Sequence, residues 1–238
     1  MKRLKGIVAA CGLLVAGTAF ADDYNRVSPS FNMDDYNYNK EFYGSNLDEN
    51  PSFTSVGAGL NYIHGFSLSK KLPMFLEVGG SINYNGHSES QWVEQEHLKE
   101  KYLVSGQFAN LNIRIPVNFA WKFKLNQKHS LTPYTGINFK FNCLSQFREG
   151  FEVDGREAWK DWVSILKKSN DVQEEDVWNI FQMGWQIGLN WGIRRFNIGV
   201  EWGYDFLPAY NQTIRIYDYK ATFKVNTSSF KLALGYTL

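Results

Sequence analysis

The dominant feature of the chain is an alternation of apolar and polar residues that returns in at least seven segments. In the stretch 107–123, every odd position from Ala109 onward is apolar, whereas most even positions are Asn, Arg or Lys. A period of two predicts a β-strand with one apolar and one polar face. The stretch is longer than a usual soluble strand of about 5–6 residues. It suits a tilted strand that crosses a bilayer, which needs about 9–11 residues.

The same alternation predicts further strands, and their connections differ in length. The links after Leu68, Leu125 and Ile193 are short, whereas the links 86–105, 148–177 and 207–225 are long and polar. Bacterial single-chain barrels have an even number of strands, with short turns in the periplasm and long loops outside. An eighth strand is therefore needed, and 24–32 is the candidate, although Pro29 removes a ladder donor. The other strands are expected to begin near Thr54, Met74, Leu131, Phe181, Phe196 and Phe230.

The sequence thus predicts an all-β, eight-stranded, antiparallel, up-and-down transmembrane β-barrel with both termini in the periplasm of a bacterial outer membrane. The alternative is a soluble lipocalin-like barrel, which would turn its apolar face inward. Here the apolar face is bulky and aromatic, and the polar face is rich in Gly, Ser and Asn. Small residues fit the crowded interior of a narrow barrel, so the pattern favours the membrane protein. Lipid-facing aromatics are then expected at Phe119, Trp121, Trp185, Trp191, Trp202 and Tyr236.

The first 21 residues have the features of a secretory signal peptide. Lys2, Arg3 and Lys5 precede an apolar run, and Ala19-Phe20-Ala21 offers a cleavage site. A lipoprotein signal ending at Cys11 is the alternative. We expect residues 22–238 to form the barrel domain.

Composition narrows the possible partners and cofactors. Without the three basic residues of the signal segment, the 25 Lys and Arg become 22 against 24 Asp and Glu, a net charge of −2. This balance does not suggest a nucleic-acid partner. Only Cys143 remains after cleavage, so neither an intramolecular disulfide nor a cysteine metal cluster is expected. No phosphate-binding loop or metal motif is present, and no cofactor is expected.

Several segments resemble the small outer-membrane β-barrel family of Bacteroidetes, the PorT-like barrel domain proteins. They are YNRVS at 24–28, GLNYIHGFSL at 59–68, LPMF at 72–75, IPVNF at 115–119, GWQIG at 184–188 and LALGY at 232–236. The resemblance implies an outer-membrane barrel without catalytic residues, in contact with lipid. It also implies that the barrel-insertion machinery reads a C-terminal aromatic residue. Leu238 stands at that place here, and Tyr236 keeps an aromatic on the same face.

Charged residues on the polar parity should meet inside the barrel. An unpaired buried ion costs several kcal/mol, so these groups are expected to pair and to plug the lumen. A narrow selective pore is the alternative. Counting from the short turns places Glu77, Glu201 and Lys231 in one layer, and Arg114, Lys140 and Asp205 about one layer higher. The full set is Arg26, Glu77, Arg114, Lys122, Lys140, Glu201, Asp205 and Lys231.

The link 148–177 carries the one pattern that is not strand-like. Trp159, Trp162 and Leu166 belong to an apolar set at helical spacing, which predicts a short extracellular helix. Its apolar stripe could cover the barrel mouth, enter the outer leaflet or bind an envelope protein. His87-Ser88-Glu89 holds the residue types of an acyl-transfer site, but adjacency in sequence does not aim them at one atom. We therefore expect a non-enzymatic scaffold, surface binder or accessory subunit, with a narrow solute channel and then a lipid-modifying enzyme as alternatives.

Overall fold

The computed structural model describes residues 22–42, 45–46, 52–69, 72–95, 100–153, 156–167, 177–216 and 219–238. The expected signal segment 1–21 lies outside these residues. The strands are β1 (Tyr24–Phe42), β2 (Ser45–Asn46), β3 (Ser52–Ser67), β4 (Met74–Gln95), β5 (Glu100–Trp121), β6 (Phe123–Lys124), β7 (His129–Val153), β8 (Arg156–Trp159), β9 (Val163–Ser164), β10 (Phe181–Ile193), β11 (Phe196–Ile216) and β12 (Tyr219–Thr237).

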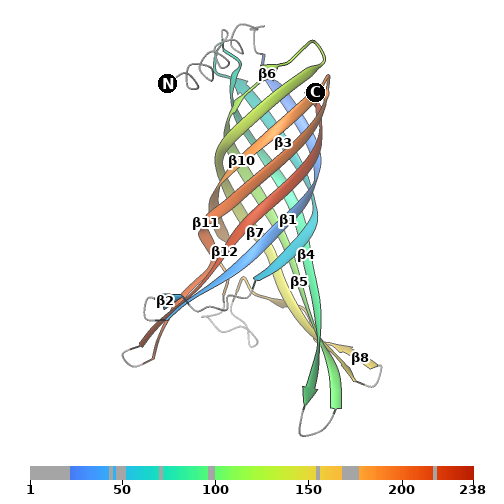
Figure 1. Ribbon diagram of the computed structural model, residues 1–238, viewed down its shortest axis with the longest axis vertical. Helices are drawn as coiled ribbons and strands as arrows, with labels where there is room; N and C mark the ends of the chain where they lie inside the picture. The colour runs from blue at the N-terminus through green and yellow to red at the C-terminus, as the bar shows by residue number, and fades with distance from the viewer. Residues whose placement is uncertain are drawn as a thin grey trace, which may run out of the picture.

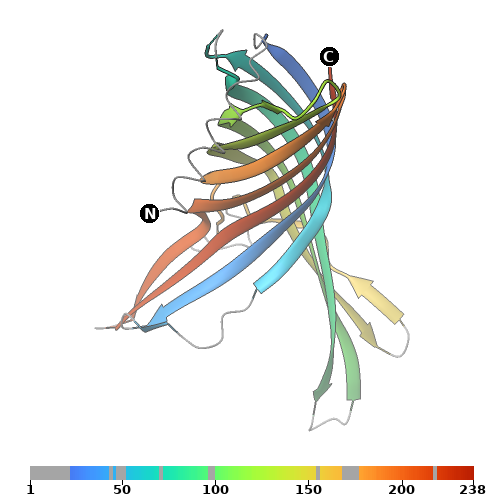
Figure 2. The same ribbon diagram turned by 45° about the horizontal axis from the view of Figure 1, so that its top comes forward.

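Eight of these strands form a closed antiparallel ring. The order β1-β3-β4-β5-β7-β10-β11-β12 returns to β1, because β12 pairs with β1 and β10 pairs with β7. Figures 1 and 2 show the tilted strands around a single barrel axis. Closure leaves no sheet edge within the ring, so each strand satisfies its backbone on both sides. The prediction of an all-β antiparallel barrel is confirmed.

Proline interrupts the ring only locally. The pairing of β1 with β12 skips Ser28 and Pro29, while the pairing of β1 with β3 continues through both residues. Pro29 lacks the N–H that a ladder on its second side would use. The 24–32 segment is therefore part of the wall, as expected, and the strand runs on to Phe42.

The two ends of the barrel differ. Both the first described residues and the C-terminus lie at the end with the short turns (Figure 1), which include the two-residue link Arg194-Arg195. Arg194 has a left-handed backbone with φ of 56°, which few residues other than Gly adopt. At the other end, called the hairpin end below, long strand pairs leave the barrel in two diverging arms (Figures 1 and 2).

These arms differ from the polar links expected there. β4 and β5 continue their pairing to Gln95 and Glu100, and β11 and β12 continue to Ile216 and Tyr219. A hairpin outside the membrane can keep its backbone hydrogen bonds without burying one face. The period-two signal then fades although the strands persist.

The prediction of a short helix in the link 148–177 is wrong for the residues described there. Arg156–Trp159 form β8, which pairs with β7, and Val163–Ser164 form β9, which also pairs with β7. The edge of β7 offers these backbone groups ladder partners, and tertiary pairing overrides a local helical spacing. In the described part of the chain, no helix is long and apolar enough to cross a bilayer.

Candidate functional site

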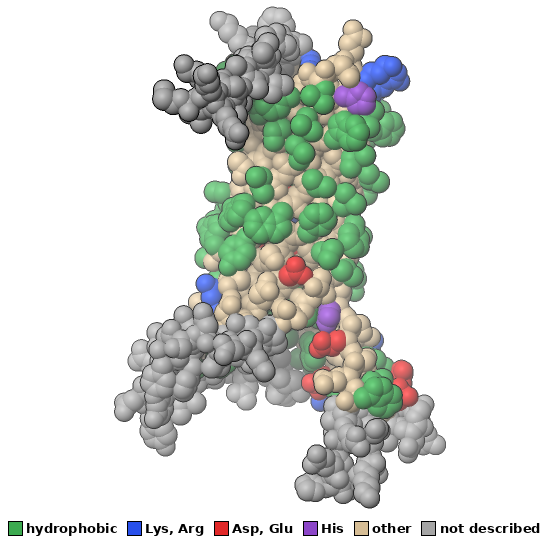
Figure 3. All heavy atoms as spheres, in the orientation of Figure 1, with side chains coloured by type: hydrophobic (Ala, Val, Ile, Leu, Met, Phe, Trp, Pro, Cys, Tyr) green, Lys and Arg blue, Asp and Glu red, His purple; other side chains and the backbone are tan. Residues whose placement is uncertain are grey.

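The alternating residues divide the wall into two chemically different faces. Bulky side chains such as Ile187 (51% exposed) and Leu60 (58%) point away from the ring. In Figure 3 hydrophobic side chains cover the middle of the visible wall, and charged ones gather toward its two ends. The predicted aromatics Phe119, Trp185, Trp191, Trp202 and Tyr236 are exposed on this outer face, and Trp121 is half-buried there. Asn, Ser and charged side chains fill the inside.

One group of interior charges lies toward the short-turn end. Arg26 Nη2 is 3.3 Å from Glu77 Oε1, and Lys231 Nζ is 2.7 Å from Glu201 Oε1. The Tyr24 hydroxyl donates a hydrogen bond to Glu77. We call the charged residues Arg26, Glu77, Glu201 and Lys231 the lower layer. It holds two cations and two anions, so its formal charge is zero.

A second group lies closer to the hairpin end. Arg114 Nη2 donates to both oxygens of Asp34 at 2.7 Å. Lys140 Nζ lies between two carboxylates, 3.7 Å from Asp34 and 3.5 Å from Asp205. We call Asp34, Arg114, Lys140 and Asp205 the upper layer. It also holds two cations and two anions, and every member is buried.

Asp34 is the functional residue that sequence reasoning missed. The expected first strand ended at Asn32, which left Asp34 outside the wall. Its parity was the available signal, because Arg26, Ser28, Ser30 and Asn32 alternate inward in register with it. Lys122, by contrast, joins neither layer. Its ammonium group lies 5.1 Å from the centroid of the Tyr24 ring.

Side-chain amides connect the strands beside the upper layer. The amide groups form a relay around much of the ring: Asn32 donates to Asn83 (3.1 Å), Asn83 to Asn112 (3.2 Å), Asn112 to Asn110 (2.6 Å), Asn110 to Asn142 (3.2 Å), and Asn142 to Gln182 (2.9 Å). Gln182 then donates to Thr227 of β12 at 3.1 Å. We call these residues the amide belt. An amide both donates and accepts, so it can pass hydrogen bonding from strand to strand in a crowded lumen.

Side chains fill the middle of the lumen. Glu77, Asn112, Lys140 and Gln182 have no exposed surface. Near the lower layer, the space among Arg26, Asn61, Asn190, Glu201 and other residues is about 40 Å³. This is room for one or two water molecules.

The hairpin end of the lumen is aromatic instead of polar. Tyr36, Phe108, Ala209 and Val225 form a buried cluster, against which Phe53 and Trp178 pack. The Tyr36 and Phe53 rings are stacked with centroids 4.7 Å apart. Burial and the carboxylate of Glu89 raise the pKa of Tyr38 beside this cluster. Its hydroxyl therefore stays neutral well above physiological pH.

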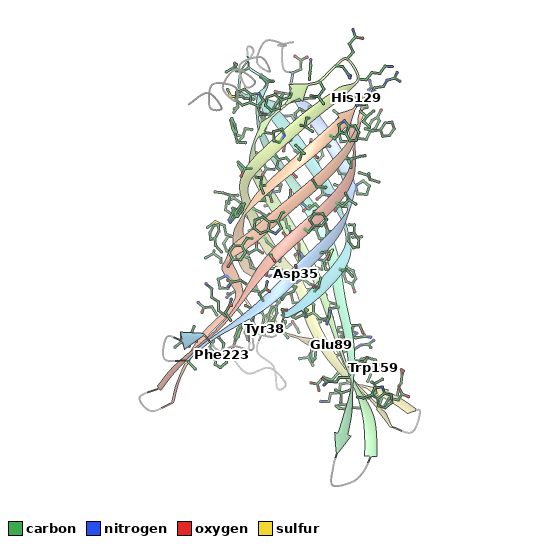
Figure 4. All side chains as sticks on the ribbon, in the orientation of Figure 1. Asp35, Tyr38, Glu89, His129, Trp159 and Phe223 are labelled. Atoms are coloured by element: carbon green, nitrogen blue, oxygen red, sulfur yellow. The ribbon has the colours of Figure 1, made fainter. Side chains whose placement is uncertain are left out.

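Two of the predicted partner-binding residues, Trp159 and Trp162, contact the same arginine side chain. The guanidinium carbon of Arg148 lies over the rings of Trp159 and Trp162, 4.5 and 4.7 Å from their centroids. It also donates to Gln107 Oε1 at 2.9 and 2.7 Å. Trp159 and Trp162 are still 36% and 39% exposed, whereas Leu166 is half-buried. Figure 4 places Trp159 on the arm formed by β4, β5, β7 and β8, away from the barrel.

The histidine-containing motif does not assemble a triad in the described residues. His87 Nε2 is 3.5 Å from Glu89 Oε2, and its Nδ1 is 2.7 Å from the Thr54 carbonyl. Ser88 points to the opposite face of β4, because neighbouring strand residues alternate. Within the described residues, no group of three or more His, Cys, Asp or Glu could hold a metal ion.

A closed antiparallel ring with a polar interior and an apolar outer wall defines a transmembrane β-barrel protein. The family model described as the outer membrane protein beta-barrel domain matches residues 20–208, and the chain belongs to this family. It is therefore a β-barrel protein of the bacterial outer membrane.

Solved structures similar to the chain include other small outer-membrane barrels. Ail, the attachment invasion locus protein of Yersinia pestis, solved with the heparin analogue sucrose octasulfate, is 16% identical. The match covers 89% of this chain and 99% of Ail at a TM-score of 0.33. OprG from Pseudomonas aeruginosa is 10% identical, covering 92% and 97% at 0.42. The Neisserial surface protein A is 8% identical, covering 87% and 96% at 0.29. A search of curated proteins finds no match.

Proposed function

We propose that this protein is a non-enzymatic outer-membrane scaffold with a closed lumen, which presents its long hairpins to a partner at the cell surface. The observation that carries the proposal is the filled interior. Two charge-balanced layers and the amide belt occupy the inside of the barrel, and the described side chains leave a space of only about 40 Å³ near the lower layer. A hydrated ion needs a continuous path, so this interior supports a scaffold over a channel.

The orientation belongs to the same proposal. Short turns face the periplasm in barrels of this kind, and long loops face outward. Both termini would then be periplasmic, and the two hairpin arms would be extracellular. The family's insertion machinery would act from the periplasmic side, and the PorT-like relationship fits this arrangement.

Two measurements test the proposal. In planar bilayers, the purified barrel should give no conductance steps beside a porin that does. For orientation, single cysteines replace Glu157 on the hairpin arm or Lys128 in a short turn, in a Cys143→Ser background. An impermeant maleimide should label Glu157→Cys on intact cells and Lys128→Cys only after permeabilisation. Regular conductance steps would contradict the closed lumen, and the reverse labelling would contradict the orientation.

The partner-binding element is proposed to be the segment of Trp159 and Trp162. Two Trp rings in contact with one guanidinium form a partly exposed apolar surface on an arm that leaves the barrel. Tryptophan is over-represented among residues that dominate binding energy at interfaces. Affinity purification in mild detergent, with identification of co-eluting envelope proteins, identifies the partner.

A further inference from the structure

A pocket of about 310 Å³ lies at the hairpin end of the barrel, beyond the polar interior. Tyr38 and Glu89, two of its lining residues, are labelled at this end in Figure 4. Known small-molecule pockets start at about this volume. Six of its lining residues carry rings, namely Tyr38, Phe53, His87, Phe108, Phe147 and Trp178.

The walls of the pocket are held by contacts among the rings. Phe53 lies 5.3 Å from Phe108 and 5.1 Å from His87, measured between ring centroids. Trp178 lies 5.9 Å from Phe108. His87 is fixed further by its contact with the Thr54 carbonyl. A ligand would therefore meet a preformed aromatic surface and would not have to order it.

The charge of the lining has one sign. Glu89 supplies a carboxylate whose side chain is 74% exposed, and the described lining contains no Lys or Arg. Arg148, whose partner Gln107 lines the pocket, is not itself a lining residue and lies over the rings of Trp159 and Trp162. A cationic ligand would thus meet a carboxylate without competition from this guanidinium.

Aromatic faces attract cations, and several faces around one site select alkylated ammonium ions. We propose that this pocket binds a small organic cation with a compact alkylated ammonium head. The inference deepens the surface-binding part of the proposed function and rests on the orientation given there. The chain's own segment 168–176 fits less well, because Asp171, Glu174, Glu175 and Asp176 would bring like charge toward Glu89.

The probe is choline, compared with 3,3-dimethylbutan-1-ol, its uncharged isostere. The folded barrel is placed in a maltoside detergent that contains no choline, and binding is followed by titration calorimetry. Cation–π attraction of about 1 kcal/mol corresponds to about fivefold in affinity, so choline should bind at least about fivefold tighter than the alcohol. Equal affinities would overturn the proposal. Glycerophosphocholine binding tighter than choline would support recognition of the ammonium head and would assign its source to a lipid head group.

Matched variants locate the binding. Trp178→Leu should weaken choline binding by about fivefold, whereas Trp92→Leu, an exposed position of β4 outside the pocket, should leave it unchanged. Glu89→Gln should weaken binding more than Glu149→Gln, whose carboxylate pairs with Lys160 at 2.8 Å. Heat-modifiability on a gel verifies that each variant is folded. If deletion of 168–176 creates choline binding that the intact chain lacks, that segment fills the pocket and the proposal fails. Conductance and surface labelling do not depend on this pocket, so they test the scaffold separately.

Discussion

At the residue scale, Asp34 is the centre of the upper layer. Its two oxygens accept from Arg114 at 2.7 Å, and one also accepts from Asn85 Nδ2 at 2.9 Å. Lys140 adds a third positive or polar neighbour at 3.7 Å. Because these groups are buried, a lost partner is not replaced by bulk solvent. Asp34 therefore compensates the charge of Arg114 and shares that of Lys140 with Asp205.

We expect Asp34→Asn to lower the free energy of unfolding by about 3–5 kcal/mol, because it breaks a buried ion pair and leaves an uncompensated charge. Asp35→Asn is the matched control. Asp35 points to the other face and accepts a hydrogen bond from Thr54 at 2.6 Å. The amide oxygen of Asn can still accept this bond, so removing the charge of Asp35 should cost about 0.5 kcal/mol or less. Urea unfolding of the barrel in detergent measures both. Equal losses for the two variants would show that the upper layer is hydrated.

A double-mutant cycle applies the same reasoning to Glu77. Glu77→Gln should leave Arg26 as a buried cation and lower the temperature at which the gel-shifted barrel unfolds. Adding Arg26→Met should recover part of the loss, because contacting residues couple by about 0.5–3 kcal/mol. Strictly additive losses would mean that the 3.3 Å contact between Arg26 and Glu77 contributes nothing.

At the element scale, the surroundings of the outer-face side chains differ between the barrel wall and the hairpin arms. Ile187 lies at the middle of β10 and is 51% exposed, opposite Trp202 and Thr135. Trp92 is also exposed, but it lies on the part of β4 that extends into the hairpin arm. Exposed apolar side chains thus occur both on the lipid-facing wall and on an arm that extends into water.

Ile187→Arg should cost about 2–4 kcal/mol, as expected for a charge near the bilayer midplane. Trp92→Arg should cost about 0–1 kcal/mol, because that position lies outside the apolar band. Unfolding free energies in lipid vesicles decide the comparison. If Ile187→Arg hardly lowers the free energy of unfolding, the apolar face of the strands does not contact lipid.

The Trp pair on the hairpin arm gives a second prediction at this scale. Replacing Trp159 and Trp162 together by Ala removes both faces that hold Arg148, but it touches no residue of the ring interior. The barrel should remain heat-modifiable, and a co-purifying partner should be lost, since truncating an interface Trp often costs 2 kcal/mol or more. Partner binding that survives in this variant would contradict the docking role.

The elements show how far a sequence can be interpreted. The alternation from Ala109 to Phe123 predicted a strand because lipid and lumen impose different chemistry on its two faces. This contrast weakens along 90–95 and 100–105, in the arm that leaves the barrel, so the continuation of β4 and β5 left no period-two signal. The segment around Trp159 gave the opposite error, because it shows a periodic pattern but does not form the predicted helix. Its helical spacing reflects two Trp rings placed around Arg148, not the turn of a helix.

At the scale of the whole molecule, the interior is balanced layer by layer. Parity alone identified most of the buried charges, but pairing depends on how eight strands are staggered around the ring. Arg114 and Asp34 are 80 positions apart in sequence and meet across the lumen. Such partners follow from closure and register, which no local pattern encodes. The pocket at the hairpin end is likewise built from strands β1, β3, β4, β5 and β7 together with Trp178.

Layer-by-layer balance predicts that two double variants of equal net charge differ in stability. Glu201→Gln with Lys231→Met removes one opposite pair from the lower layer, whose atoms are 2.7 Å apart. Glu201→Gln with Lys140→Met removes the same charges from different layers and leaves each layer unbalanced. The first pair should couple favourably by about 0.5–3 kcal/mol, whereas the second should be additive within about 0.5 kcal/mol. Urea unfolding of the three single and two double variants in the same detergent measures both couplings. Equal couplings would show that only the total charge of the lumen matters, because charges would then compensate one another along its whole length.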